Sequence, residues 1–110
     1  MTEAPPAPSA SQALGAFVAE SDWAAIEPGL RHEAKRALLN AFGCALVSAA
    51  DPAVATAAAV LSPFAGPAQA TVIGRPERLD PMAAAFVNAI AANLLDFDDT
   101  HFASGLHPTA

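Results

Sequence analysis

The sequence predicts an all-α protein, and three observations support this class. Alanine accounts for 30 of the 110 residues, and hydrophobic residues make up 54% of the chain. Aromatic residues contribute only 6% and tyrosine is absent, which disfavours sandwiches and barrels because their strands are rich in aromatic and β-branched residues. Apolar side chains also recur every four residues in one segment, at Ala34, Leu38, Phe42 and Leu46, which is a helical spacing.

The first part of the chain is predicted to contain a leader and two helices. Residues 1–10 are expected to be a disordered leader, because they hold three prolines and almost no bulky side chains. A first helix is expected over residues 11–20, and a longer one over residues 30–49. The last third of the longer helix is apolar on every side, so we expect other elements to bury it.

Two Asp-Pro pairs mark the starts of the remaining helices. Aspartate is a favoured N-cap, and proline is tolerated at the first helical position because its missing N–H would have no partner there. Asp51-Pro52 therefore predicts a helix to about Leu61, and Asp80-Pro81 predicts one to about Leu95. Between them, residues 70–74 are expected to form a short extended connector or an edge strand.

Charge and composition exclude several function classes. The formal net charge is −6 and no basic stripe is present, so binding to nucleic acid is not expected. The single cysteine, Cys44, cannot form an internal disulfide, which fits a reducing compartment, and we expect it to be a buried, inert thiol. The N-terminus lacks the features of a secretory signal, and the uncharged residues 53–74 include prolines and glycine. A cytoplasmic protein without a membrane span is therefore predicted.

Candidate chemistry is concentrated after the last predicted helix. Three carboxylates, Asp96, Asp98 and Asp99, lie within four positions at the C-terminal end of an apolar helix. The helix dipole is negative at that end, and neighbouring carboxylates repel one another. No lysine or arginine follows Arg78 to relieve either effect. Acidic residues at the unfavourable end of a helix, without a neighbouring cation to compensate them, indicate a functional site.

The expected geometry depends on whether the helix continues through this segment. If it does, Asp96 and Thr100 lie one turn apart on the same face, with Asp99 nearby, while Asp98 turns away. His101 and His107 follow and can exchange protons near neutral pH. Pro108 disfavours a helical conformation at the preceding histidine, which we therefore expect in a loop that folds over the helix end.

Other interpretations of the same residues remain open at this point. The three aspartates could lie in a solvated loop without any function. Asp96, Asp98 and Thr100 also match the Asp-x-Asp-x-Thr pattern of haloacid-dehalogenase-type phosphatases, which place the first aspartate at the end of a β-strand. A divalent metal is compatible with the ligand types, although no spacing demands one. His32, among charged neighbours, is expected to be exposed.

After residue 12 the sequence resembles the start of an MmgE/PrpD family member. The matching segments occur in family-like order and spacing. They are residues 34–40 with 43–46, residues 51–54, residues 70–74, and residues 95–101 with His107-Pro108. The run Leu-Asp-Phe-Asp-Asp-Thr-His is the most specific of them.

The resemblance implies both a fold and an activity. Family members have a large helical domain, which includes this N-terminal region, and a smaller lid domain, commonly in a homodimer. They are lyases and epimerases of small polycarboxylates, such as 2-methylcitrate dehydratase and cis-aconitate decarboxylase, and work without a metal or organic cofactor. The resemblance assigns His107 to proton transfer or substrate contact, Thr100 to a hydrogen bond with the substrate, and Asp96 to orienting or polarising a partner. Asp99 and His101, which lie close by in the sequence, are expected to bind the substrate or to support the residues that do.

The sequence also departs from the family pattern. Residues 11–110 correspond only to the N-terminal portion of the helical domain, without the lid domain, the substrate-binding lysines, a further histidine and a tyrosine. A tricarboxylate needs cationic partners, so we expect the 110-residue chain alone to be inactive. The alternative is a small helical module that no longer catalyses and instead binds a partner. Which substrate is used, and whether it is dehydrated, decarboxylated or epimerised, does not follow from these residues.

Overall fold

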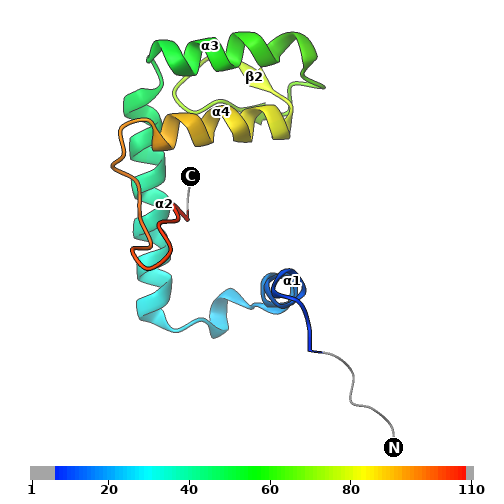
Figure 1. Cartoon of the computed structure of the whole chain (residues 1–110), viewed down its shortest axis with the longest axis vertical. Helices are drawn as coiled ribbons and strands as arrows, with labels where there is room; N and C mark the ends of the chain where they lie inside the picture. Colours follow the sequence, from blue (N-terminus) through cyan, green and yellow to red (C-terminus); the bar gives the residue numbers. More distant parts are fainter. Residues whose placement is uncertain (1–6, 109–110) are drawn as a thin grey trace, which may run out of the picture. The chain divides into compact units, whose positions relative to one another are not determined.

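The computed structural model describes residues 7–108, which divide after Glu33 into two compact units. Most of the regular structure in these residues is helical, which confirms the predicted class (Figure 1). The elements in chain order are α1 Ala10–Glu20, η1 Trp23–Ala25, α2 Pro28–Ser48, α3 Pro52–Leu61, η2 Ser62–Phe64, β1 Ala70–Thr71, β2 Arg78–Leu79 and α4 Pro81–Asn93, where η marks a 3-10 helix.

The start of α1 lies within the predicted leader. Residues 1–6 of that leader are outside the described residues, and Ala10 is the first residue of α1. Ser9 forms a capping box with Gln12: the Ser9 hydroxyl accepts from the Gln12 backbone N–H at 3.3 Å, and the Gln12 side chain accepts from the Ser9 N–H at 2.8 Å. These two bonds satisfy backbone donors that a helix start otherwise leaves without partners.

Both Asp-Pro pairs start helices as predicted. The Asp51 carboxylate accepts from the Ala53 N–H at 2.8 Å and caps α3. Asp80 caps α4 by accepting from the N–H groups of Met82 and Ala83 at 3.0 and 3.2 Å. Backbone donors, that of Ala83 foremost, hold the pKa of Asp80 below its usual range and outweigh the opposing effect of desolvation.

The predicted extended segment forms one half of a small antiparallel hairpin. Ala70 pairs with Leu79 and Thr71 with Arg78, so the sheet has only two residues in each strand. Gly74 lies in the connection at φ +71°, where an L side chain is strained. Asn88 of α4 holds the hairpin: its side-chain oxygen accepts from the Ile73 N–H at 2.8 Å, and its amide donates to the Thr71 carbonyl at 3.0 Å.

The core of the second unit lies between α3, α4 and the hairpin. α3 and α4 run side by side, with the hairpin behind them in the view of Figure 1. Val54, Val72 and Val87, one from each of these elements, are fully buried in it. Alanines of α3 and α4 fill the remaining space, so the helices approach closely but bury little area per residue.

Only one face of the end of α2 is buried. Cys44 and Ala45 are buried, which confirms the predicted burial of the cysteine, whereas Leu46 and Val47 are 57% and 73% exposed. The expectation that this third of the helix would be covered on every side is therefore wrong for the described residues. An apolar composition predicts burial, but how many neighbours cover a helix depends on the tertiary arrangement.

No single helix among the described residues is long and apolar enough to cross a membrane. The helices α2 and α3, the latter extended by η2, pass the test of length and composition only as a pair, and the chain bends by 91° between them.

Candidate active site

The segment after α4 leaves the helix earlier than predicted. α4 ends at Asn93 rather than near Leu95, and the Asp96 N–H then donates to the Asn93 carbonyl at 2.9 Å. Asp96 has φ +56°, a left-handed conformation that aspartate tolerates better than most residues because its short polar side chain can bond locally. This residue turns the chain out of the helical path.

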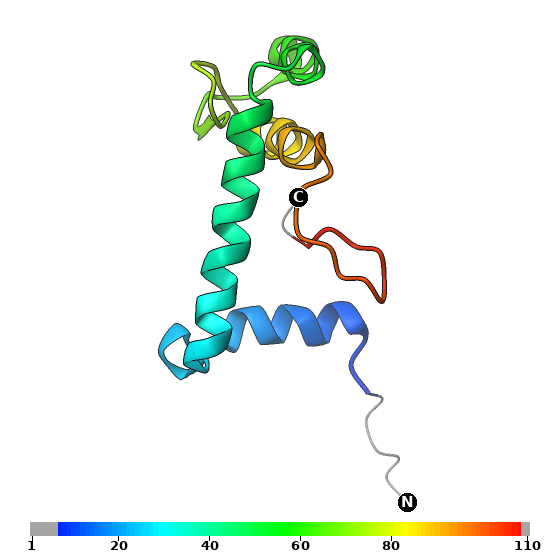
Figure 2. The same cartoon turned by 90° about the vertical axis from the view of Figure 1, so that its left-hand side faces the viewer.

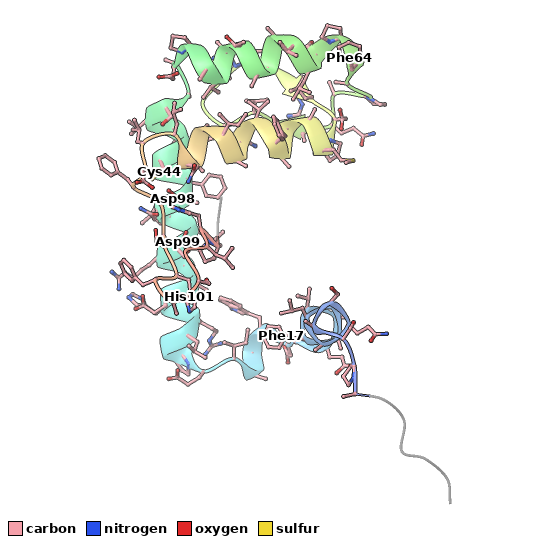
Figure 3. The ribbon with its side chains drawn as sticks, in the orientation of Figure 1. Phe17, Cys44, Phe64, Asp98, Asp99 and His101 are labelled. Carbon is pink, nitrogen blue, oxygen red and sulfur yellow. The ribbon has the colours of Figure 1, made fainter. Side chains whose placement is uncertain are left out.

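The turn at Asp96 reverses the orientation expected for the aspartates. Because helical geometry stops at Asn93, the one-turn spacing of Asp96 and Thr100 does not hold, and both residues are exposed. Asp98 was expected to turn away, yet its side chain has no exposed surface. Asp99 is half-buried. Figure 3 shows Asp98, Asp99 and His101 along the segment that follows α4.

Asp98 and His107 form a close pair. The Oδ2 atom of Asp98 lies 2.8 Å from Nδ1 of His107, whose side chain is 29% exposed. The Asn93 amide nitrogen lies 3.4 and 3.3 Å from the two carboxylate oxygens of Asp98, and 3.4 Å from the same imidazole nitrogen. The last residue of α4 therefore contacts both members of the pair.

A tight loop returns the chain to the helix end. The His101 N–H donates to the Leu106 carbonyl at 2.8 Å, and the Gly105 N–H donates to the His101 carbonyl at 2.8 Å. Gly105 has φ +68°, which allows the reversal. In Figure 2 the segment, drawn in orange to red, leaves α4 and turns back toward it. This confirms the prediction that His107 lies in a loop folded over the helix end.

A second contact holds the segment against α2. The Asn40 side-chain amide donates to the Phe97 carbonyl at 3.1 Å, so the residue between Asp96 and Asp98 is tied to a helix 57 positions earlier in the chain. His101 is exposed, and its Nδ1 lies 2.7 Å from the Ser104 hydroxyl. His101 thus has a partner within its own loop.

An apolar hollow of about 610 Å³ lies between α2 and α4. Phe42, Ile73 and Phe86 are among the side chains that line it, and Asn88 is the one polar lining residue in the part of the chain that the structure describes. The Asn88 side chain already bonds to the Ile73 N–H and the Thr71 carbonyl. Because no titratable group of the described residues 7–108 lines this hollow, acid–base chemistry is more consistent with the Asp98–His107 pair.

Comparison with known proteins identifies the family. A family model described as the MmgE/PrpD N-terminal domain matches residues 12–110. The chain belongs to the MmgE/PrpD family. No curated protein and no solved structure matches the chain significantly. Membership of the MmgE/PrpD family indicates dehydratase or lyase-like chemistry and agrees with the mostly helical structure.

The structure brings together only some of the residues predicted for an MmgE/PrpD site. Ligand-type atoms of Asp96, Asp98 and His107 all lie within 4.8 Å of one another. Among the described residues, His101 and Asp99 are not members of this group, and Thr100 is exposed. The haloacid-dehalogenase interpretation does not fit, because α4 precedes Asp96 where that family has a β-strand.

Two residues that contact His107, Asn93 and Asp98, were not predicted from the sequence to belong to the site. Asn93 is one of two asparagines in the otherwise apolar α4, and an isolated polar residue near the end of such a helix could have drawn attention to it. Asp98 was among the three carboxylates that drew attention to the segment, but it was expected to turn away from the site. Its burial depends on the left-handed turn at Asp96 and on the return of His107, which are not visible in local spacing.

The same group contains ligand types that could hold a divalent cation. Carboxylate oxygens and an imidazole nitrogen are suitable donors, and Asp96, Asp98 and His107 present them at compatible separations. Coordination of the cation through Nδ1 of His107 would replace the hydrogen bond between Nδ1 and Asp98, because an imidazole nitrogen cannot carry a hydrogen and bind a metal at the same time. The resemblance to MmgE/PrpD enzymes implies catalysis without a metal.

Proposed function

We propose that this chain contributes an acid–base histidine to a cofactor-independent lyase that acts on small polycarboxylates. The reaction is a dehydration or hydration of the 2-methylcitrate type, or a decarboxylation of the cis-aconitate type. The observation that carries this proposal is the pairing of His107 with the buried Asp98, at 2.8 Å, within an MmgE/PrpD N-terminal domain. Histidine is the side chain best suited to accept and return a proton near neutral pH.

The proposed chemistry needs one side chain that takes a proton from, or gives a proton to, the substrate carbon next to a carboxylate group. In a dehydration, His107 takes the proton from that carbon and passes it to the hydroxyl on the adjacent carbon, which leaves as water. In a decarboxylation, the bond to one carboxyl group breaks, carbon dioxide leaves, and a protonated histidine supplies the proton that replaces it. Thr100 and Asp96, which are both exposed, are proposed to bond and orient the substrate.

Binding of the substrate requires cations that the C-terminal segment does not carry. No lysine or arginine follows Arg78 in the sequence, and carboxylates are held best by charge-assisted bonds from such residues. We therefore expect the 110-residue chain by itself to be inactive. The active form is proposed to be a homodimer of the protein that includes this segment together with the missing cationic groups.

The test is proton exchange in deuterated water by the protein expressed from the complete reading frame that includes this segment. Incubation with 2-methylcitrate, and separately with cis-aconitate, is followed by proton NMR, which detects both product and deuterium incorporated into the substrate. We expect His107→Gln to lower the rate by about 10²- to 10⁴-fold. His32→Gln, at an exposed histidine that is not part of the Asp96, Asp98 and His107 group, is the matched control and should keep the wild-type reaction rate. Wild-type turnover by the His107 variant would exclude this proposal.

A non-catalytic interaction module is the second candidate, and exposed apolar side chains favour it. Leu38, Phe42 and Phe86 are each more than half exposed and lie beside the apolar hollow. A 110-residue chain that is monomeric in analytical ultracentrifugation and melts cooperatively would favour an independent module. Self-association that the complete protein does not show would instead favour a segment of a larger domain, whose apolar side chains are covered by the rest of that domain.

A further inference from the structure

We infer that Asp98 is a positioning residue that keeps hydrogen on Nδ1 of His107 and leaves Nε2 as the nitrogen that exchanges protons with the substrate. This inference rests on the proposed function. An ionised carboxylate can only accept hydrogen bonds, so at 2.8 Å from Asp98 the His107 Nδ1 must be the donor. In the neutral ring, hydrogen on Nδ1 leaves the lone pair on Nε2.

The contacts of Asn93 are compatible with the same assignment. Its amide nitrogen lies 3.4 Å from Nδ1 of His107, but a protonated nitrogen cannot also accept a bond from that amide. The amide can instead donate to the Asp98 carboxylate, whose oxygens lie at 3.3 and 3.4 Å. The carboxylate then accepts from both neighbours, while the asparagine ties it to the end of α4.

The difference in burial between Asp98 and His107 fits a role in orienting the histidine. The Asp98 side chain has no exposed surface, and a buried charge is unfavourable unless it is hydrogen-bonded or paired. For stability alone, apolar side chains of similar size often serve as well as a buried ion pair. The His107 ring, in contrast, stays 29% exposed, and its contacts with the side chains of Asn93 and Asp98 both use Nδ1. A buried carboxylate behind a partly exposed imidazole is the arrangement that orients a histidine for proton transfer.

The direct test is the tautomer of His107 in the 110-residue chain. Long-range proton–nitrogen correlation spectra of the nitrogen-15-labelled chain distinguish protonated from unprotonated ring nitrogens. They are recorded at increasing pH until the ring signals no longer change. We expect hydrogen on Nδ1 in the wild type and its loss from that nitrogen in Asp98→Asn, because an amide can donate to Nδ1. Asp51→Asn is the matched control: it removes the same charge, and asparagine is an equally good N-cap for α3.

A wild-type ring with hydrogen on Nε2 would overturn the inference without any variant. An unchanged tautomer in a folded Asp98→Asn chain would overturn it as well, with folding checked by circular dichroism. In the complete protein, Asp98→Asn should lower kcat by about 10²- to 10⁴-fold with little change in KM and an altered pH profile, while Asp51→Asn should not. Lyase activity that Asp98→Asn leaves intact would exclude the positioning role. The expected tautomers without any lyase activity would support the geometry and refute the proposed function instead.

Discussion

Replacing Gly74 by alanine tests how the hairpin is held against α2. An alanine Cβ at this position would lie 2.6 Å from the Cβ of Ala49, closer than packed carbon atoms approach one another. The backbone at Gly74 also has φ +71°, which an L side chain adopts only with strain. The substitution therefore combines a conformational cost with a collision between two parts of the second unit.

The two costs can be estimated separately. The left-handed conformation costs about 1–2 kcal/mol for a residue with a Cβ, and lowering the entropy of the unfolded chain returns about 0.4–1 kcal/mol. Overpacking of the contact with Ala49 adds about 1–3 kcal/mol, since the opposing atom is a short side chain attached directly to the backbone. We expect Gly74→Ala to lower the free energy of unfolding by about 1–5 kcal/mol, with a midpoint of about 3 kcal/mol.

Gly105 provides a matched control for the conformational cost. It has φ +68°, but an added Cβ would meet no atom within 4 Å. Gly105→Ala changes the unfolded chain in the same way and should cost only about 1 kcal/mol. The difference between the two variants isolates the collision at Ala49.

Urea unfolding followed by circular dichroism measures both variants, because the single tryptophan, Trp23, lies in the first unit and would not monitor this contact. Adding Ala49→Gly to Gly74→Ala removes the opposing Cβ and should recover most of the difference between the two glycine variants. Equal losses for Gly74→Ala and Gly105→Ala, or no recovery in the double variant, would refute the packing argument.

Two further predictions concern the support of α4. Asn88→Ala leaves the Ile73 N–H without its acceptor and should lower the free energy of unfolding by about 1–3 kcal/mol. Hydrogen exchange of the Ile73 amide should become faster. An Ile73 amide that stays protected from exchange in this variant would contradict the assigned hydrogen bond. The pKa of Asp80 is lowered in the folded chain, so its ionised form stabilises the fold above about pH 4, and this contribution disappears as the pH falls through the folded-state value. Asp80→Asn keeps an N-cap and should reduce the acid-induced loss of stability in urea titrations; an unchanged pH dependence would contradict the role of this carboxylate.

Much of the helical framework could be predicted because it depends on contacts close in sequence. The Asp51-Pro52 and Asp80-Pro81 pairs start α3 and α4 through bonds from each carboxylate to backbone groups two or three residues later. The extended segment near Ala70 was predicted too. Its partner, Arg78–Leu79, was not, because two residues are too few to show a strand pattern.

The sequence by itself therefore determined the starts of α3 and α4, the family and the segment that contains the candidate chemistry. The tertiary structure alone decided which aspartate meets His107. That choice depends on the left-handed turn at Asp96, on the loop closed by Gly105, and on the contact of Asn93 with both members of the pair. These interactions join residues up to 14 positions apart, outside any helical repeat, so periodicity placed Asp98 on the wrong side and only the folded chain placed it beside His107.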